Sequence, residues 1–382
     1  MALAPALLVS LLLFPNSLSA GPQSRSPASS TFATISSKAD AARDANRLDE
    51  ALVLYRKALA LRPKWAEGWW SLGTIQYDRN AYADAVSAFK AVVRLKPTDG
   101  TAHAMLGLSE FELGRDKQAL QHIRTAKKLG IAKDAQLRNV VLYHDAVLLQ
   151  RAGKFEAAKQ TLQQMCLEGT ENSQIATILG MVLLRTPNKT VPPSGSPDAD
   201  VVSRIGNAEC LAGKKNYDQA REIFKMLVQQ YPTYPNIHYA YGMFLLDAGD
   251  TATAVTEFKQ EIENTPNHVF ARLQIAAANY KTDSAVGLPY AAEAVKLNPR
   301  LPFAHYLLGL LLLDTDNYQK AIPELEVAKK SLPRESKLYF ALGSAYSRAG
   351  REQEARQARQ TFTRLQQAEQ ARGDENSGIS VH

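Results

Sequence analysis

Hydrophobic residues recur along this chain at the spacing of helix faces, and the helices they predict come in pairs. In the segment that begins at Trp69, this residue and Gly73 belong to one apolar face, and Ala85 and Phe89 belong to a second. A short polar turn separates the two faces. Pro97 follows the second face and ends its helix, because proline cannot continue the backbone hydrogen bonding. The segment is therefore predicted to form two antiparallel helices.

The same pattern returns at a fixed interval. Ala51, Ala85 and Ala119 are 34 positions apart, and aromatic residues follow the first two by four positions, at Tyr55 and Phe89. Small residues let two helices approach closely, and large residues fill the space beside them. One pair of helices cannot bury its apolar face alone, so neighbouring pairs must stack on one another.

This pattern resembles the tetratricopeptide repeat family. The unit of that family has about 34 residues, with W-x2-L-G-x2-Y in its first helix and A-x3-F-x2-A before a proline in its second. Copies of the pattern can be followed through most of the chain. The resemblance implies an all-α fold, a right-handed superhelical solenoid of about nine repeats in two sub-arrays.

The copies and the segments between them divide the chain into six expected parts. After Gly180 the second helix of a repeat is replaced by the Pro-rich segment "TPNKTVPPSGSPDA", so the preceding helix is predicted to lack a partner. The expected parts are a signal peptide at 1–20, a disordered linker at 21–31, four repeats at 32–172, an orphan helix and Pro-rich loop at 173–199, five repeats with a polar capping helix at 200–369, and a disordered tail at 370–382.

The first residues predict export. The apolar run from Ala6 to Phe14 is too short to span a bilayer as a helix, and it precedes the small-residue site "SLSA". These features are typical of a cleaved signal peptide, although no Lys or Arg precedes the run. We expect a periplasmic or secreted protein with no membrane span after cleavage. An uncleaved anchor and a cytoplasmic product are the alternatives.

The charge and the cysteine content argue against nucleic-acid binding, a disulfide framework and a metal site. The formal net charge is +7, and basic and acidic residues alternate along the predicted helices, which favours solvated faces over nucleic-acid binding. The two cysteines, Cys166 and Cys210, form neither a disulfide framework nor a metal site. They are expected to be small buried residues. A bridge between them in an oxidising compartment stays open, since the sequence does not give the distance between them.

Candidate chemistry is sparse. His103, His238 and His305 all occupy the fourth position of their repeats, so a solenoid would space them apart, and packing explains them better than metal ligation. "GNAECLAGKK" has the wrong spacing for a phosphate-binding loop. The sequence predicts no catalytic residue, no metal and no cofactor.

The resemblance also implies a binding face. In the family, certain first-helix positions line the concave surface and contact ligands. These positions lie about 100° from the packed face, so they should be wetter than the core. The alternative is that some of their rings pack against adjacent first helices. The implied partner-binding residues are Trp70, Tyr77, Phe111, Tyr143, Tyr239, Met243, Arg272, Asn279, Phe303, Tyr306 and Phe340.

These observations predict a non-catalytic scaffold whose concave groove holds a peptide or a partner protein. The alternative is an accessory or assembly subunit of an envelope enzyme or secretion complex, and an enzyme in its own right is a third hypothesis. Under the first hypothesis, replacing Tyr239 and Tyr306 with alanine should weaken partner binding and leave the melting temperature nearly unchanged.

Overall fold

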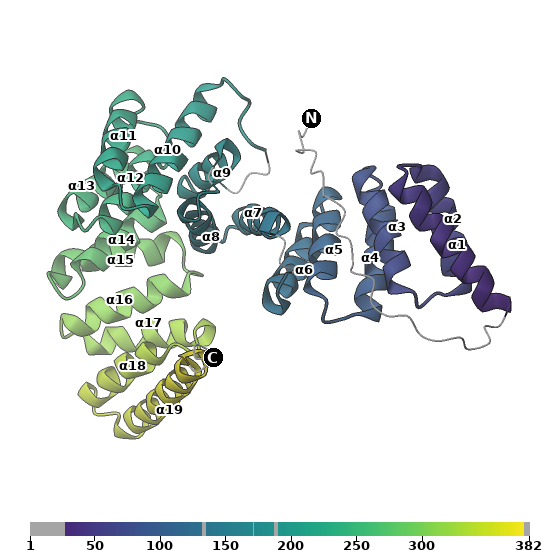
Figure 1. Cartoon of the computed structure of the whole chain (residues 1–382). Coiled ribbons are helices and arrows are strands. Elements are labelled where there is room, and N and C mark those ends of the chain that lie inside the picture. Colours follow the sequence, from purple (N-terminus) through teal and green to yellow (C-terminus); the bar gives the residue numbers. More distant parts are fainter. Residues whose placement is uncertain (1–26, 132–134, 171, 187–189, 378–382) are drawn as a thin grey trace. The chain divides into compact units, whose positions relative to one another are not determined.

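The computed structural model describes residues 27–131, 135–170, 172–186 and 190–377. Every regular element in these ranges is an α-helix, so the predicted all-α fold is confirmed. The chain divides into two compact units, Met1–Lys214 and Lys215–His382. Figure 1 labels the helices of both units, and in the second unit they stack in chain order.

The helices of unit 1 are α1 (Pro27–Asp44), α2 (Leu48–Leu61), α3 (Ala66–Asp78), α4 (Tyr82–Leu95), α5 (Gly100–Glu112), α6 (Asp116–Leu129), α7 (Ala135–Arg151), α8 (Phe155–Leu167), α9 (Ser173–Leu183) and α10 (Pro197–Gly213). Those of unit 2 are α11 (Tyr217–Gln230), α12 (Ile237–Asp247), α13 (Thr251–Asn264), α14 (Val269–Asn279), α15 (Ser284–Leu297), α16 (Pro302–Asp314), α17 (Tyr318–Ser331), α18 (Ser336–Arg348) and α19 (Glu352–Ser377).

Neighbouring helices form pairs by placing a large side chain on a glycine. A Cβ added at Gly73 of α3 would lie 3.0 Å from the Phe89 ring of α4, and one added at Gly242 of α12 would lie 2.5 Å from Phe258 of α13. Glycine is therefore required for this close approach. The pairs that share the most extensive contacts are α1 with α2, α3 with α4, α5 with α6, α7 with α8, α9 with α10, α12 with α13, α14 with α15, α16 with α17, and α18 with α19.

The core of each unit contains the predicted large residues of the second helices. Tyr55 and Phe89 in unit 1, and Phe224 and Phe258 in unit 2, have fully buried side chains. Burying a side chain of this size contributes roughly 1.5–3 kcal/mol. The 34-residue interval thus identified the residues that hold neighbouring helices together.

A hydrogen bond to a proline carbonyl recurs at the start of the first helices. The residue at the fourth position of the repeat lies six positions after the proline and donates to its carbonyl oxygen. The donors are Trp69 to Pro63 (2.9 Å), His103 to Pro97 (3.2 Å), His238 to Pro232 (2.9 Å), His305 to Pro299 (3.0 Å) and Tyr339 to Pro333 (3.1 Å). This bond fixes five first helices, α3, α5, α12, α16 and α18, to the end of the helix before each.

The prediction that α9 is an orphan helix is wrong. It packs against α10 across the Pro-rich loop, and each helix contributes a glycine to the crossing. A Cβ at Gly180 would lie 1.9 Å from the carbonyl oxygen of Val202, and one at Gly206 would lie 1.7 Å from that of Ala176. The two backbones therefore touch, and Gly206 serves helix packing instead of a phosphate loop.

The boundary between the units also differs from the predicted one. It falls after Lys214 and not inside the Pro-rich loop. The loop ends earlier than expected, because the Ser196 hydroxyl accepts a hydrogen bond from the Ala199 amide (3.1 Å) and caps a helix that starts at Pro197. Residues 197–199 therefore belong to α10.

The ends of the described chain are more helical than predicted. Helix α1 begins at Pro27, inside the expected linker 21–31, and α19 continues to Ser377, inside the expected tail 370–382. Arg, Glu and Gln dominate α19, and these residues are favourable in a helix. The expected signal peptide and the last residues, 378–382, lie outside the described residues.

Candidate protein-interaction surfaces

The predicted partner-binding residues fall into three groups by exposure. The half-buried ones are Trp70, Tyr77, Phe111, Tyr143, Met243, Asn279 and Tyr306. Phe303 and Phe340 are exposed, at 49% and 61% of their full accessible surface. Tyr239 and Arg272 are buried, at 2% and 8%. Neither buried side chain is placed to contact a partner, so their assignment to a binding face is wrong.

Tyr239 is buried because a neighbouring first helix covers it. Its ring packs against Phe258 of its own pair, at 5.7 Å between centroids, and against His268 at the start of α14, at 4.9 Å. Its position on the helix predicted that Tyr239 would face solvent. In the structure, the first helix of the next repeat occupies that space. Replacing Tyr239 with alanine would therefore disturb the core, contrary to the expectation of unchanged stability.

Arg272 and Asn279, both on α14, are engaged within unit 2. The Arg272 Nε donates to Glu293 Oε2 at 2.7 Å, and one terminal nitrogen donates to the His268 carbonyl at 3.3 Å. The Asn279 amide donates to the Ile275 carbonyl at 2.8 Å. These contacts lie within the α14–α15 pair and engage both side chains.

In unit 2, two exposed rings and one half-buried ring lie on the first helices α16 and α18. Phe303 and Tyr306 lie on α16 with ring centroids 6.4 Å apart, and Phe340 of α18 lies 5.5 Å from Phe362 of α19. Burial, together with the nearby Glu335 carboxylate, raises the pKa of Tyr306 to about 12. We call Phe303, Tyr306 and Phe340 the phenylalanine surface. Its rings would lose unfavourable contact with water if a partner covered them.

In unit 1, the corresponding aromatic residues have acidic neighbours. Tyr77 of α3 packs edge to face against Tyr82 of α4 at 5.4 Å, and Phe111 follows on α5. Asp78 and Glu112 are the last residues of α3 and α5. We call Tyr77, Asp78, Tyr82, Phe111 and Glu112 the aromatic–acidic surface. Burial and neighbouring negative groups raise the pKa of Tyr77 well above its usual value.

Trp70 of α3 and Tyr143 of α7 are two further half-buried rings of unit 1. The Trp70 ring contacts Phe89 at 5.5 Å, edge to face, and Tyr143 contacts the buried His144 ring at 5.4 Å. Each ring is thus supported from below by the core while part of it stays accessible. Rigid, partly exposed aromatic side chains of this kind provide contact area at a small entropy cost.

The histidines at the fourth repeat position have structural roles. Besides its bond to the proline carbonyl, His238 places Nδ1 2.6 Å from Glu257 Oε2, and His305 places Nδ1 2.6 Å from Glu324 Oε2. In unit 1, His103 meets His122 at 3.1 Å in place of a glutamate. Among the described residues, His, Cys, Asp and Glu form no group of three or more that could hold a metal ion.

We expect a pH-dependent contribution of His238 to the stability of unit 2. Burial alone would lower its pKa, but the hydrogen bond and charge of Glu257, with the Pro232 carbonyl and Glu261, raise it above the usual 6.5. Both ring nitrogens face acceptors, so the protonated ring makes both bonds. The stabilisation is therefore complete below about pH 6.5 and is lost as the pH rises through the raised pKa.

An NMR titration of the His238 ring protons tests this expectation. The wild-type pKa should lie above 6.5, and Glu257→Gln should lower it. A wild-type pKa at or below 6.5 would contradict the role given to Glu257.

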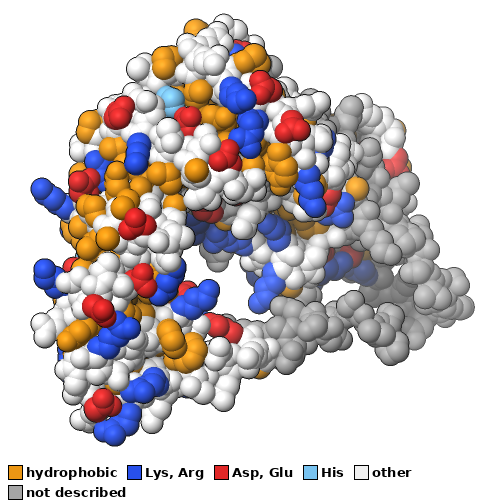
Figure 2. Space-filling model, turned by 90° about the vertical axis from the view of Figure 1, so that its left-hand side faces the viewer, with side chains coloured by type: hydrophobic (Ala, Val, Ile, Leu, Met, Phe, Trp, Pro, Cys, Tyr) orange, Lys and Arg blue, Asp and Glu red, His pale blue; other side chains and the backbone are white. Residues whose placement is uncertain are grey.

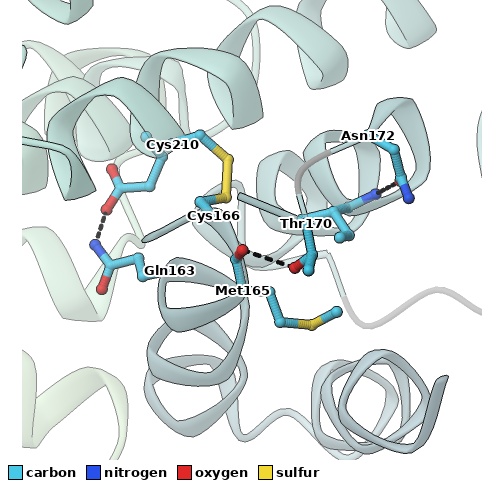
Figure 3. Close-up of a disulfide and its surroundings, with 8 residues drawn as sticks. Gln163, Met165, Cys166, Thr170, Asn172 and Cys210 are labelled. Atoms are coloured by element: carbon cyan, nitrogen blue, oxygen red, sulfur yellow. Dashed lines mark hydrogen bonds between the residues drawn. A yellow bond between two sulfur atoms is a disulfide. The ribbon is translucent and has the colours of Figure 1, made fainter. Parts of the chain in front are cut away.

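The two cysteines are joined. Cys166 of α8 and Cys210 of α10 form a disulfide (Figure 3). Their Cα atoms are 5.4 Å apart. Beside it, Gln163 Nε2 donates to Glu209 Oε1 at 2.5 Å, and the Lys159 ammonium lies 3.0 Å from the same oxygen. Both cysteines are buried, as expected. The covalent bond and the buried polar contacts fix α8 to α10.

Charge is dispersed on the face of the molecule that Figure 2 shows. Lys and Arg side chains lie among Asp, Glu and hydrophobic side chains there, without a block of one sign. In the described ranges, no helix combines the length and the hydropathy that crossing a bilayer requires.

Sequence comparisons agree with the repeat pattern. Two tetratricopeptide repeat family models match, one at residues 37–100, 76–134 and 277–333 and the other at residues 208–234. Tetratricopeptide repeat protein 21A of the mouse (Mus musculus) is 21% identical over 306 residues, which are 78% of this chain and 22% of that protein. The chain therefore spans about a fifth of the length of this relative.

Solved structures of MamA are similar to part of the chain. A MamA RS-1 ArsTM double mutant is 23% identical with a TM-score of 0.41, covering 44% of this chain and 94% of that one. MamA from Desulfovibrio magneticus RS-1, from residue 41 to its end, is 24% identical with a TM-score of 0.39 and the same coverage. The family assignment rests on the sequence matches and on the glycine, aromatic and proline positions described above. By these criteria the matched segments of the chain are tetratricopeptide repeats.

Proposed function

We propose that this chain is an exported, non-catalytic scaffold that binds a peptide or a partner protein on the faces of its first helices. The observation that carries the proposal is the phenylalanine surface, where Phe303 and Phe340 expose about half or more of their side chains. Exposed rings on adjacent first helices lower solubility unless another molecule covers them. Binding would bury these rings and gain roughly 25 cal/mol for each Å² of apolar surface removed from water.

The disulfide supports the export part of the proposal. Disulfides persist in oxidising compartments and are rare in the cytosol, where thiols are kept reduced. The Cys166–Cys210 bridge is buried, and it joins helices that pack in the same unit, so it is a structural bond. An extracytoplasmic location, periplasmic or secreted, would allow this bond to form and persist.

A paired substitution tests the binding surface. Phe303→Ser with Phe340→Ser should reduce capture of the partner by about tenfold or more, because the side chains that a partner would bury are removed. The folded state should change little, since exposed side chains contribute within about 0.5 kcal/mol. The matched control is Met226→Ser with Val327→Ser, which removes exposed apolar side chains from the second helices α11 and α17.

The measurement uses the full chain as bait in separate cytoplasmic and extracytoplasmic extracts of the source cells. Quantitative mass spectrometry should find a protein from the extracytoplasmic extract that wild type and control retain and that the phenylalanine variant loses. If the variant retains every captured protein, the phenylalanine surface is not the binding face. A partner found only in the cytoplasmic extract would contradict export.

A further inference from the structure

Two histidine rings face one another between α5 and α6. His103 Nδ1 lies 3.1 Å from His122 Nδ1, while the ring centroids are 5.3 Å apart. The rings therefore meet through these two nitrogens and are not stacked face to face. In the repeats that contain His238 and His305, a glutamate carboxylate occupies the place of the second ring. The α5–α6 repeat thus replaces a carboxylate by a second imidazole.

The contacts on the far side of each ring fix its orientation. His103 Nε2 lies 3.2 Å from the Pro97 carbonyl oxygen, which can only accept, so Nε2 carries the hydrogen and Nδ1 presents a lone pair. His122 Nε2 lies 3.9 Å from Glu110 Oε2. Glu110 is 1% exposed, and this oxygen has no hydrogen-bond donor in the part of the chain that the structure describes. A hydrogen on His122 Nε2 would supply the donor after a side-chain adjustment of about 1 Å.

A neutral His122 ring cannot satisfy both of its contacts. With its hydrogen on Nδ1 it donates to His103, but it turns a lone pair toward the buried Glu110 oxygen. With its hydrogen on Nε2 it faces Glu110 correctly, but two nitrogen lone pairs then meet at 3.1 Å. A second proton would satisfy both contacts. Burial, His103 and Lys90 lower the pKa of His122 below the usual 6.5, however, so the ring is neutral at pH 7.

A divalent transition-metal ion between the two Nδ1 atoms resolves this conflict. Two nitrogens that bind one ion at about 2.0–2.1 Å are about 2.9 Å apart at a right angle and about 3.3 Å apart at the tetrahedral angle. The observed separation of 3.1 Å lies between these values. Both Nε2 hydrogens would then face the Pro97 carbonyl and the Glu110 carboxylate, which are the outer contacts that orient metal-binding histidines. The His122 side chain is 23% exposed, so solvent reaches the pair.

We infer that His103 and His122 form a two-histidine site for a divalent transition-metal ion and that Glu110 positions the His122 ring. Among such ions Cu²⁺ binds nitrogen ligands most tightly. Two histidines leave the other coordination positions to water or to a side chain of another molecule, so the ion is exchangeable. Lys90 lies 3.9 Å from the other Glu110 oxygen, and its ammonium stays in contact with solvent because the side chain is 57% exposed.

Titration of the full chain with glycine-buffered Cu²⁺ tests the inference. Wild type should bind an ion whose electron paramagnetic resonance spectrum shows coupling to two imidazole nitrogens. His122→Gln should weaken binding of this ion by at least about tenfold, because the amide can donate to His103 Nδ1 but is a poor ligand for Cu²⁺. Circular dichroism of each variant confirms that the helices are retained.

The same substitution at two equivalent positions provides the matched control. Tyrosine occupies the fourth repeat position at Tyr339, where its hydroxyl donates to the Pro333 carbonyl. His103→Tyr should therefore keep the bond to the Pro97 carbonyl and abolish the two-nitrogen signal. His305→Tyr makes the same change beside a glutamate and should leave the signal and the Cu²⁺ affinity unchanged.

A third variant separates the positioning role of Glu110 from a structural one. Glu110→Gln keeps both histidines and removes the carboxylate, so Cu²⁺ affinity should fall by about tenfold. The melting temperature of the metal-free chain should stay at or above that of wild type, because a buried carboxylate oxygen without a donor is unfavourable. Wild-type Cu²⁺ affinity in this variant would refute the positioning role.

Absence of the two-nitrogen signal in wild type, wild-type Cu²⁺ affinity in His122→Gln, or an equal loss in His103→Tyr and His305→Tyr would overturn the inference. The inference does not depend on the proposed function. The bait experiment with Phe303 and Phe340 decides that function independently.

Discussion

Replacing Gly206 with alanine should open the contact between α9 and α10 and lower the local stability by more than about 3 kcal/mol. The added Cβ would lie 1.7 Å from the carbonyl oxygen of Ala176, a backbone atom that no side-chain rotation can move away. The helices must separate, and the packing between them is lost. Hydrogen exchange measured by mass spectrometry should show amide protection in α9 and α10 reduced about 100-fold or more.

The matched control is Gly213→Ala at the end of the same helix. A Cβ at Gly213 meets no atom within 4 Å. Alanine is a better helix former than glycine by about 1 kcal/mol, so protection should stay the same or rise slightly. If Gly206→Ala retained wild-type protection, the close crossing of α9 and α10 would be incorrect, and the prediction of an orphan helix would stand again.

Removing the disulfide should lower the free energy of unfolding of unit 1 by up to about 4 kcal/mol. The bond joins residues separated by 44 positions, and closing a loop of that length in the unfolded chain accounts for an effect of this size. The variant to compare with wild type is Cys166→Ala with Cys210→Ala. Tryptophan fluorescence during urea unfolding reports on this unit, because all three tryptophans, Trp65, Trp69 and Trp70, lie in it.

Unfolding in the presence of a reductant is the control for the effect of the disulfide. Dithiothreitol should shift the urea midpoint of wild type toward that of the alanine variant and should leave the variant itself unchanged. An unchanged wild-type midpoint under reducing conditions would mean that the buried contacts of Lys159, Gln163 and Glu209 already hold α8 on α10 without the covalent bond.

Spacing along the sequence was sufficient to predict how most helices pair. A glycine such as Gly73 and a phenylalanine such as Phe89 sit at fixed positions of a repeat, so one copy predicts the contact in the next. This reasoning failed at α9, because it assumed that a helix pairs only with a close neighbour in sequence. Gly180 and Gly206 could have indicated this pairing, since a glycine leaves the helix backbone open to close contact with another helix.

The candidate surfaces were less predictable, because exposure depends on the next repeat. The position of Tyr239 on its helix correctly predicted which way its side chain points. The prediction of exposure failed because His268 of the following repeat covers the ring. Tyr82 was missed for a related reason, since it begins a second helix, and its ring packs against Tyr77 of the first helix. The disulfide depended on a distance between Cys166 and Cys210 that periodicity alone does not contain.

The bond to the proline carbonyl explains how the repeats diverge without losing their geometry. Tryptophan, histidine and tyrosine all serve at that position, because the requirement is a donor of suitable reach and not a particular ring. Phenylalanine has a ring of similar shape, but it has no hydrogen-bond donor for the proline carbonyl. Recognition of distant repeats should therefore improve when these three residues are scored as equivalents six positions after a proline.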